Sequence, residues 1–376
     1  MDIWLNILKV KTGKKSIAAA VLVLIVLLMT AECLFAGSAN MTFMDCIHAL
    51  LRKGTPVQIR IIWNIRVPRV LAALIAGAGL SVSGLIMQTT LNNPMASPST
   101  LGVSNAAVFG ANLSIIAFAG GFLSTGNNIS NYTSGINPYA ASLMAFIFSV
   151  LSVLVILGLC RIRSFDPGVV VLAGIAIGSV WTAATTILQF YATDVGLSAA
   201  VIWNFGDLGR ATYKTDLIMF VVVAAGFLVF MILSWRYNAL LSGDVAAKSV
   251  GVNVELLRFI SLLLGSVIVA VCVSFLGIIG FVGIICPHIT KKIWGQNHHY
   301  SIPVSALTGS LLLLFADTIS RSIGNGSALP VGAITSLLGA PFLLQLYFHG
   351  GAIMFKIDNL CYRYKKHPHM FLMVYL

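Results

Sequence analysis

The chain has 376 residues, a mean hydropathy of +0.96 and a formal net charge of +12, although only 9% of its residues are charged. The positive charges are scattered between apolar stretches rather than gathered in one patch, which argues against a nucleic-acid-binding face. Many apolar stretches approach the roughly 20 residues that cross a bilayer as a helix, so the composition indicates a multi-pass membrane protein.

Ten apolar stretches follow one another along the chain, and the one at 280–295 is the least clear. Gly, Ala and Ser are frequent in them, and such small residues let membrane helices pack closely. The sequence therefore predicts an all-α polytopic fold of about ten transmembrane helices, forming a single domain over 1–376. The predicted spans are 17–36, 67–90, 99–120, 138–160, 168–191, 217–235, 259–279, 280–295, 303–320 and 330–349.

The orientation follows from Lys and Arg, which are retained on the cytoplasmic side of short connections. Ten spans put both termini on one side, and that side holds fifteen of the 23 basic residues. Segments 1–15, 236–258 and 356–376 are therefore predicted to be cytoplasmic. The remaining eight basic residues fall in three external segments and are Arg52, Lys53, Arg60, Arg66, Arg69, Arg210, Lys214 and Arg321.

Two of these arginines flank Pro68 at the start of the second span, in the string "IRVPR". Proline fits the first turn of a helix, so Arg69 is expected at the helix start and Arg66 in an extended segment before it, both at the external surface. The positive end of the helix dipole disfavours cations there. Contact with lipid phosphate and contact with an external partner both remain open as explanations.

The second and the last span carry small residues at helical spacing. Gly77 and Ser81 are four residues apart, as are Gly332 and Ser336. Such stripes allow a helix to be enclosed by other helices, and they serve either plain packing or a transport pathway.

The string "NNPMASP" at 92–98 interrupts the apolar pattern. Pro94 and Pro98 remove two backbone donors and disfavour helix before them, so this segment must be shielded by protein or face water. It is either a simple turn or part of a pathway.

The longest internal cytoplasmic connection is 236–258. Asp244 is expected to cap a short helix, and Gly251 is expected to end that helix in a left-handed turn. This helix is either a solvated linker or a docking element.

Patterns typical of catalysis and metal binding are scarce. No GxxxxGK[ST] phosphate loop occurs, so we do not expect the chain to hydrolyse ATP by itself. No HExxH or paired-carboxylate spacing occurs, and the six cysteines stand singly, so neither a cofactor nor a metal site is predicted. Asp317 lies within an apolar span, where a proton relay is possible in principle, but an ion pair with Arg321, four residues on, is the favoured interpretation.

Three blocks in series carry a resemblance to a known family. They are the strings "RVPRVLAALIAGAGLSVSGLIMQTTLNNPMASPSTLGVSNAAVFGA" at 66–111, "LGIIGFVGIICPHITKKIWGQNHHYSIPVSALTGSLLLLFADTISRSI" at 276–323, and "LPVGAITSLLGAPFLLQLY" at 329–347. In order and spacing they resemble the permease subunits of FecCD/BtuC-like ABC importers for iron-siderophore, haem and cobalamin. The chain departs from the family pattern at Lys291 or Lys292, one of which stands where an arginine is usual, and at 297–299, where "NHH" replaces "DHR".

The resemblance implies a type II ABC importer bundle in the cell membrane. It implies a homodimer, or a heterodimer with a similar permease, two ATPase subunits on the cytoplasmic side, and an extracellular or periplasmic binding protein that delivers the substrate. A ferric siderophore is the first substrate implied, followed by haem and cobalamin. No resident cofactor is implied.

The resemblance also implies roles for residues at matching positions. External arginines would meet acidic residues of the binding protein, segment 92–98 would form the cytoplasmic gate, and the short helix in 236–258 would couple to the ATPase. The residues so implied are Arg66, Arg69 and Arg321 for docking, Asn93, Pro94 and Met95 for the gate, Gly243, Asp244, Ala247 and Gly251 for coupling, and Gly77, Ser81, Gly84, Gly332, Ser336 and Gly339 for pathway or packing.

Two other classes of function are weighed against this one. An ion-coupled secondary transporter would also use broken helices, but it needs ionisable groups within the membrane. Asp317 and Glu32 are too few such groups to favour this class. A membrane enzyme would need a cluster of His, Asp or Glu at one membrane face, and the sequence suggests none.

Overall fold

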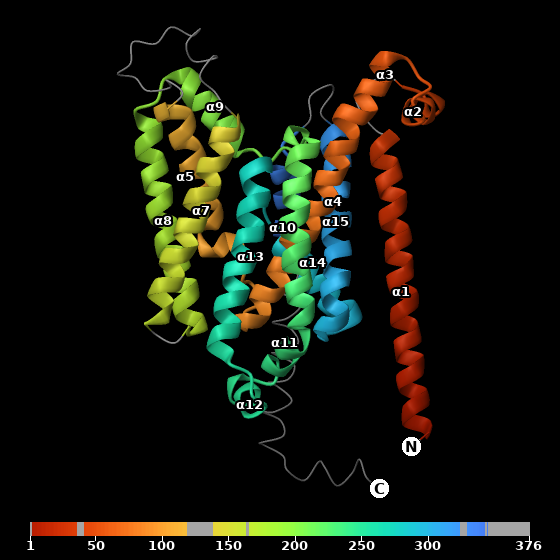
Figure 1. Ribbon diagram of the computed structural model, residues 1–376, viewed down its shortest axis with the longest axis vertical. Helices are drawn as coiled ribbons and strands as arrows, with labels where there is room; N and C mark the ends of the chain where they lie inside the picture. The colour runs from red at the N-terminus through yellow and green to blue at the C-terminus, as the bar shows by residue number, and fades with distance from the viewer. Residues whose placement is uncertain are drawn as a thin grey trace. The chain divides into compact units, whose positions relative to one another are not determined.

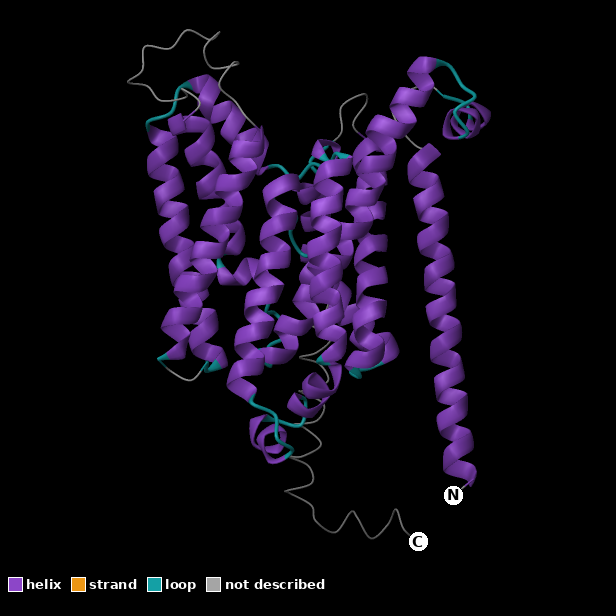
Figure 2. Cartoon of the chain, in the orientation of Figure 1, coloured by secondary structure: helices purple, strands orange, loops and turns teal. Residues whose placement is uncertain are grey.

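The computed structural model describes residues 2–35, 41–118, 138–162, 165–323, 329–342 and 344. The predicted cytoplasmic tail 356–376 lies outside these residues. Backbone contacts divide the chain into a unit 1–335 and a unit 336–376, and each is described by itself. Every regular element within the described residues is a helix (Figure 2). The all-α fold class is therefore confirmed.

Within the described residues, seven helices are long and apolar enough to cross a membrane. They comprise α1 (Asp2–Phe35), the continuous α3 (Pro56–Ile61), η1 (Ile62–Arg66) and α4 (Val67–Thr90), then α7 (Pro138–Arg161), α8 (Pro167–Phe190), α10 (Tyr213–Ile232), α13 (Val254–Leu276) and α15 (His298–Ile323). The other three predicted spans contain shorter helices, namely α5 (Val103–Asn112) with η3 (Leu113–Phe118), α14 (Val282–Trp294) and the helix Val331–Phe342.

Short helices connect the spans. They are α2 (Phe43–Leu50), η2 (Pro98–Leu101), α9 (Asp194–Asn204), η5 (Leu208–Arg210), α11 (Ser234–Leu240) and α12 (Asp244–Ser249). In Figure 1, α11 and α12 lie at the opposite end of the bundle from α2, α3 and α9. By the charge distribution, α12 is at the predicted cytoplasmic end and α2 at the predicted external end.

Helix α4 is the central helix of the unit 1–335, and it packs on α15, α13, α14 and α10 (Figure 1). Small residues allow these close approaches: a Cβ added to Gly77 would collide with the backbone of Gly309, and one added to Gly84 with that of Gly283. The Ser81 and Ser305 hydroxyls share a hydrogen bond of 2.7 Å. Three of the predicted small residues thus face α14 or α15 at helix contacts.

The start of the second span differs from the prediction. The helix begins at Pro56 rather than near residue 67, and Arg66 is the last residue of the π-helix η1, not part of an extended segment. The Val67 amide donates to the Ile62 carbonyl, five residues back. This wider turn accommodates Pro68, which lacks an amide donor and whose ring needs room against the preceding turn.

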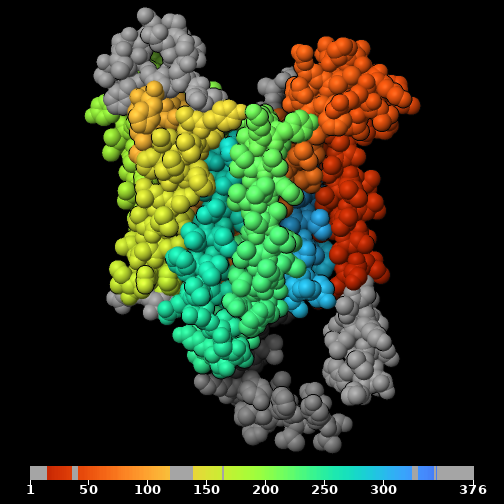
Figure 3. Space-filling model, in the orientation of Figure 1, coloured from red at the N-terminus to blue at the C-terminus, as the bar shows by residue number. Residues whose placement is uncertain are grey.

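Helix α1 lies at one edge of the bundle and packs on α15 (Figure 3). Leu22 of α1 joins a small apolar cluster with Trp294 and Val304, and the Trp294 indole donates to the Lys15 carbonyl at 3.2 Å. Over the C-terminal end of α1, α2 and α3 bury Cys46, Ala49 and Ile62 in a second apolar cluster that includes Phe35. The middle of α1 and its C-terminal end are therefore fastened to the rest of the unit.

We predict that Gly77→Val destabilises the protein strongly, because the added methyl groups have no room against Gly309. Overpacking of this kind costs about 1–3 kcal/mol or more. Gly158→Val in α7 is the matched control, since nothing lies within 4 Å of a Cβ at Gly158. Thermal unfolding in detergent measures both variants, and equal losses of stability would contradict the close contact between α4 and α15.

Candidate functional site

The segment after α4 is non-helical, as predicted for 92–98. Asn92 has a left-handed backbone with φ of 44°, and the Asn93 amide turns back to the Gln88 carbonyl. The Met95 amide donates to the Asn93 side chain at 2.9 Å, and the Met95 side chain is 46% exposed. Ser97 then caps η2, whose first residue is Pro98.

This segment borders a cavity of about 610 Å³ that lies between it, η2, α5 and α8. Asn93 and Met95, two of the three predicted gate residues, line the cavity. The sequence analysis missed its opposite wall, which α8 forms. The only signal in the sequence is a stripe of small residues at intervals of four, namely Gly174, Gly178, Thr182 and Thr186.

Small residues and one amide bring α8 close to this site. A Cβ on Gly174 would collide with the backbone of Thr100 and Leu101 in η2. The Asn105 amide of α5 donates to the Gly178 carbonyl at 3.1 Å and to the Thr182 hydroxyl at 3.2 Å. The position of α8 beside the predicted gate is therefore set by direct backbone contact and by hydrogen bonds.

The wall of this cavity is neutral. The described residues that line it are Asn, Met, Ala, Ser, Thr, Gly, Val and Ile, and none carries a charge. The hydroxyls of Thr182 and Thr186 donate to carbonyls of α8 itself, four residues back. Within the described part of the chain, no group of three or more His, Cys, Asp or Glu side chains could hold a metal ion. The site can therefore surround a bulky solute without ligating it.

The predicted coupling segment forms α12, at the predicted cytoplasmic end. Gly251 has φ of +83° and ends the helix in a left-handed turn, as expected. Ala247 is buried. The expected cap is wrong: Gly243 occupies the N-cap position, and Asp244 is the first helical residue. The Asp244 carboxylate instead accepts a hydrogen bond of 2.9 Å from Arg258 of α13, a charged partner that a local pattern does not reveal.

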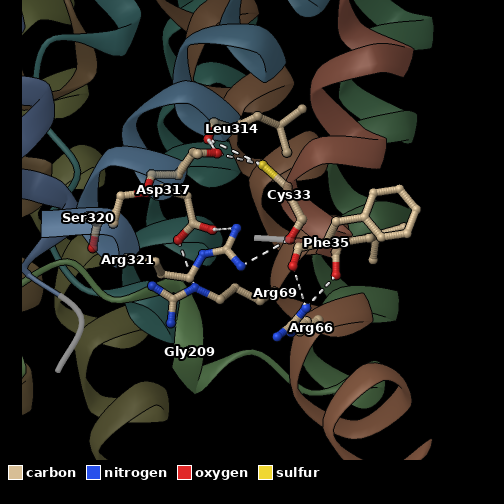
Figure 4. Close-up of polar contacts among 12 residues, drawn as sticks. Cys33, Phe35, Arg66, Arg69, Gly209, Leu314, Asp317, Ser320 and Arg321 are labelled. Carbon is tan, nitrogen blue, oxygen red and sulfur yellow. Dashed lines mark hydrogen bonds and ion pairs between the residues drawn. The ribbon is translucent and has the colours of Figure 1, made fainter. Parts of the chain in front are cut away.

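Two of the external arginines fasten the end of α1 (Figure 4). Arg66 Nη1 donates to the Leu34 and Phe35 carbonyls, both at 2.8 Å, and Arg321 Nη1 donates to the Cys33 carbonyl at 3.0 Å. The last four carbonyls of a helix have no partner within it and form the negative end of its dipole, so guanidinium groups satisfy them well.

Asp317 is completely buried and pairs with two arginines (Figure 4). The predicted pair with Arg321 is confirmed at 3.0 Å, and Arg69 Nε donates to the other carboxylate oxygen at 2.7 Å. Arg69 also lies 3.8 Å from Asp207, which is partly exposed. The sequence analysis missed the Arg69 partner because 248 residues separate it from Asp317.

The expected surface position of the three docking arginines is therefore wrong. Arg66 and Arg69 are only 4% and 8% exposed, and the Arg321 side chain is 9% exposed. Burial without partners would cost several kcal/mol per charge. The α1 carbonyls and Asp317 offset part of this penalty by partnering the guanidinium groups, although Nη2 of Arg66 and Nη2 of Arg69 have no hydrogen-bond partner among the described residues.

Of the remaining predicted residues, three lie in the last helix that the structure describes, and Pro94 lies in the segment after α4. Gly332 lies close to the Ile278 carbonyl and to Gly206, in a junction where the Val331 amide donates to the Gly206 carbonyl. Ser336 and Gly339 lie on the same helix, Val331–Phe342, in the unit 336–376. Pro94 is exposed beside Met95.

We predict that Asp317→Asn lowers the stability by about 3–5 kcal/mol, because it removes the counter-charge that contacts the buried guanidinium groups of Arg69 and Arg321 most closely. Asp207→Asn is the control, since its pair with Arg69 is longer and partly exposed, and we expect a loss of about 0–1 kcal/mol. Thermal unfolding of the purified protein in detergent compares the two. Similar losses would show that Asp317 is not the centre of this cluster.

Three comparisons with known proteins agree with this architecture. A protein of Methanocaldococcus jannaschii provisionally named an ABC transporter permease is 44% identical over 339 residues, which cover 90% of this chain and 96% of that one. The hemin transport system permease of Yersinia pestis is 34% identical over 322 residues, which cover 85% and 93%. The solved structure of an inward-facing ABC transporter of metal-chelate type matches with a TM-score of 0.74 at 28% identity, over 88% of this chain and 99% of that one.

The sequence profile of the FecCD transport family matches residues 21–349, which is most of the chain. Together with the helices that can cross a membrane, this match identifies the protein as a multi-pass membrane permease that belongs to the FecCD transport family.

Proposed function

We propose that the chain is the membrane-spanning subunit of an ABC importer that moves a ferric siderophore into the cytoplasm. The observation that carries this proposal is the neutral cavity at the predicted gate, lined by Asn93 and Met95 on one side and by small residues of α8 on the other. A chelated iron ion is already fully ligated, so its passage needs room and weak contacts rather than metal ligands.

The lining favours a siderophore over haem as the substrate. Hydroxyl and amide groups such as those of Ser99, Asn105 and Thr182 suit the polar outer surface of a siderophore. Haem would be bound better by a site with aromatic side chains and an axial ligand to its iron, such as His or Tyr. Haem and cobalamin remain the alternatives within the same family.

ATP hydrolysis belongs, in this proposal, to separate subunits that dock on the cytoplasmic end. The chain has no phosphate loop, and α12 offers a short helix between two glycines with positive φ, Gly243 and Gly251. A compact helix of this kind can transmit a rigid-body movement. A second permease, identical or similar, would complete the pathway opposite α8.

A binding protein would dock on the external end. Docking through Arg66, Arg69 and Arg321 stays a prediction, and their burial requires that they act indirectly. Arg69 contacts Asp207 in the loop before η5, so it can fix the shape of that loop for a partner.

An ion-coupled secondary transporter is the second candidate. Asp317 supports it poorly, because two arginines already neutralise that carboxylate. Asp216 supports it better, since this buried carboxylate has no hydrogen-bond partner among the described residues.

We predict that uptake requires ATP and no ion gradient. The permease would be reconstituted in proteoliposomes with its ATPase and binding protein and tested with labelled ferric siderophores, haem and cobalamin. ATP-driven uptake that resists a protonophore, and that survives Asp216→Asn, is expected. Uptake driven by a proton gradient in the absence of ATP would contradict the ABC mechanism, and uptake of haem or cobalamin alone would correct the substrate.

We further predict that Thr186→Trp reduces uptake about tenfold or more, because passage through a narrow pathway depends on its width and the indole ring would fill the cavity. Ile187→Trp, at an exposed neighbouring position of α8 outside the cavity lining, is the control. Initial uptake rates are compared at equal amounts of inserted protein. Equal effects of the two substitutions would show that this cavity is not on the transport route.

A further inference from the structure

Arg258 of α13 lies at a junction of three helices near the cytoplasmic end. Its side chain is 6% exposed, and its guanidinium group makes two contacts in different directions. Nε donates to the carbonyl of Thr90, the last residue of α4, at 2.9 Å, and Nη2 donates to the carboxylate of Asp244, the first residue of α12, at 2.9 Å. One rigid group therefore joins α4, α12 and α13.

The α4 contact of Arg258 is close to the predicted gate. Only Leu91 and Asn92 separate Thr90 from Asn93, which lines the cavity. The Asn93 amide is bonded to the Gln88 carbonyl in the last turn of α4, so the gate segment is attached to that turn by the backbone. A displacement of the end of α4 must therefore displace Asn93.

The α12 contact of Arg258 is part of a short, bounded element. Helix α12 has six residues, and Gly243 and Gly251, both with positive φ, stand on either side of it. Val245 is 84% exposed and Val250 is 62% exposed, so α12 presents apolar side chains outward, while its Asp244 end is fixed to Arg258.

A second polar contact holds the end of α4 without reaching α12. Lys291 of α14 donates to the Gln88 side chain at 3.0 Å, and the Gln88 amide donates to the Ile284 carbonyl at 3.3 Å. This pair ties α4 to α14 only. Among the described residues, the Arg258 guanidinium is the side-chain group that contacts both α4 and α12 directly. Thr89 of α4 also contacts His298 of α15 at 2.8 Å, and His298 contacts Asn238 of α11, but neither contact reaches α12 itself.

We propose that Arg258 is a positioning residue that passes movement of α12 to the gate at Asn93 and Met95. This inference rests on the proposed function, in which an ATPase subunit moves α12. The guanidinium group is planar and rigid and offers donors in several fixed directions, so it holds a carbonyl and a carboxylate at a set separation. Charge-assisted hydrogen bonds of this kind, buried from water, are stronger than neutral ones.

The first test uses Arg258→Gln in the complex reconstituted with its ATPase and binding protein, with a labelled ferric hydroxamate as the probe. We expect uptake to fall about tenfold, the factor that one charge-assisted hydrogen bond is worth, while ATP hydrolysis continues. Arg161→Gln, an equal charge change at an exposed residue at the end of α7, is the control and should leave both rates unchanged. Parallel loss of uptake and hydrolysis would overturn the proposal.

Two further variants separate the link from a simple ion pair. Arg258→Lys keeps the charge but cannot hold both acceptors, so partial recovery is expected. Asp244→Arg combined with Arg258→Asp restores opposite charges but leaves the Thr90 carbonyl without its donor, so uptake should stay low. Full recovery in the double variant would show that only the ion pair matters and would overturn the three-helix link.

A substrate-independent readout separates this inference from the proposed function. In a background with Cys361→Ser, Met95→Cys places a single exposed thiol at the gate, since the five cysteines of the described chain are buried. Its reaction rate with a membrane-impermeant maleimide should change several-fold between the nucleotide-free and the ATP–vanadate states, and Arg258→Gln should abolish that change.

The outcomes are distinct. If no chelate is transported but the thiol responds to ATP–vanadate only with Arg258 present, the substrate assignment fails and the link holds. If the response is the same with Arg258→Gln, the link is wrong. Should Arg258→Gln fail to insert, Asp244→Ala removes the α12 contact alone at a side chain that is 46% exposed, and it must reduce the thiol response.

Discussion

Arginine side chains satisfy the ends of helices throughout this protein, and much of the structure depends on that interaction. The last carbonyls of a helix have no partner within it, and near a membrane they have little water to replace one. A guanidinium group supplies several donors and a positive charge at the negative end of the helix dipole. In the described chain, arginines donate to terminal carbonyls of α1, α4 and α9, and they are Arg66, Arg321, Arg258 and Arg210.

Helix α4 connects these contacts to one another, because it contacts α15, α14 and α13 along its length. Near its first residue Arg69 binds Asp317 of α15, and at its last residue the Thr90 carbonyl accepts from Arg258 of α13. Between them, Gly77 and Gly84 let α15 and α14 approach the α4 backbone. Charge is thus concentrated at paired helix ends, whereas the cavity beside the predicted gate is neutral. A rigid charged frame around a neutral wall suits the proposed passage of a large solute that is not retained.

The sequence alone predicted the features that depend on neighbouring residues. Apolar runs specified where helices form, because a backbone in lipid must satisfy its own hydrogen bonds. Pro94 and Pro98 specified the break after α4, since each removes a backbone donor. Gly251 specified the end of α12, and the pair of Asp317 with Arg321 followed from four-residue spacing on one helix face. The resemblance to the family also named Asn93 and Met95 as gate residues, and the structure places both in the lining of the cavity.

Only the tertiary structure decided which distant groups meet. The partner of Asp244 is Arg258 rather than its own helix, and the partner of Arg69 is 248 residues away. The sequence likewise did not predict the α8 wall of the cavity or the burial of the arginines. A small or basic residue does not reveal in sequence whether it faces lipid, water or another helix. Local patterns determine backbone hydrogen bonding and apolar period, but the distance between side chains far apart in the sequence is set by helix packing.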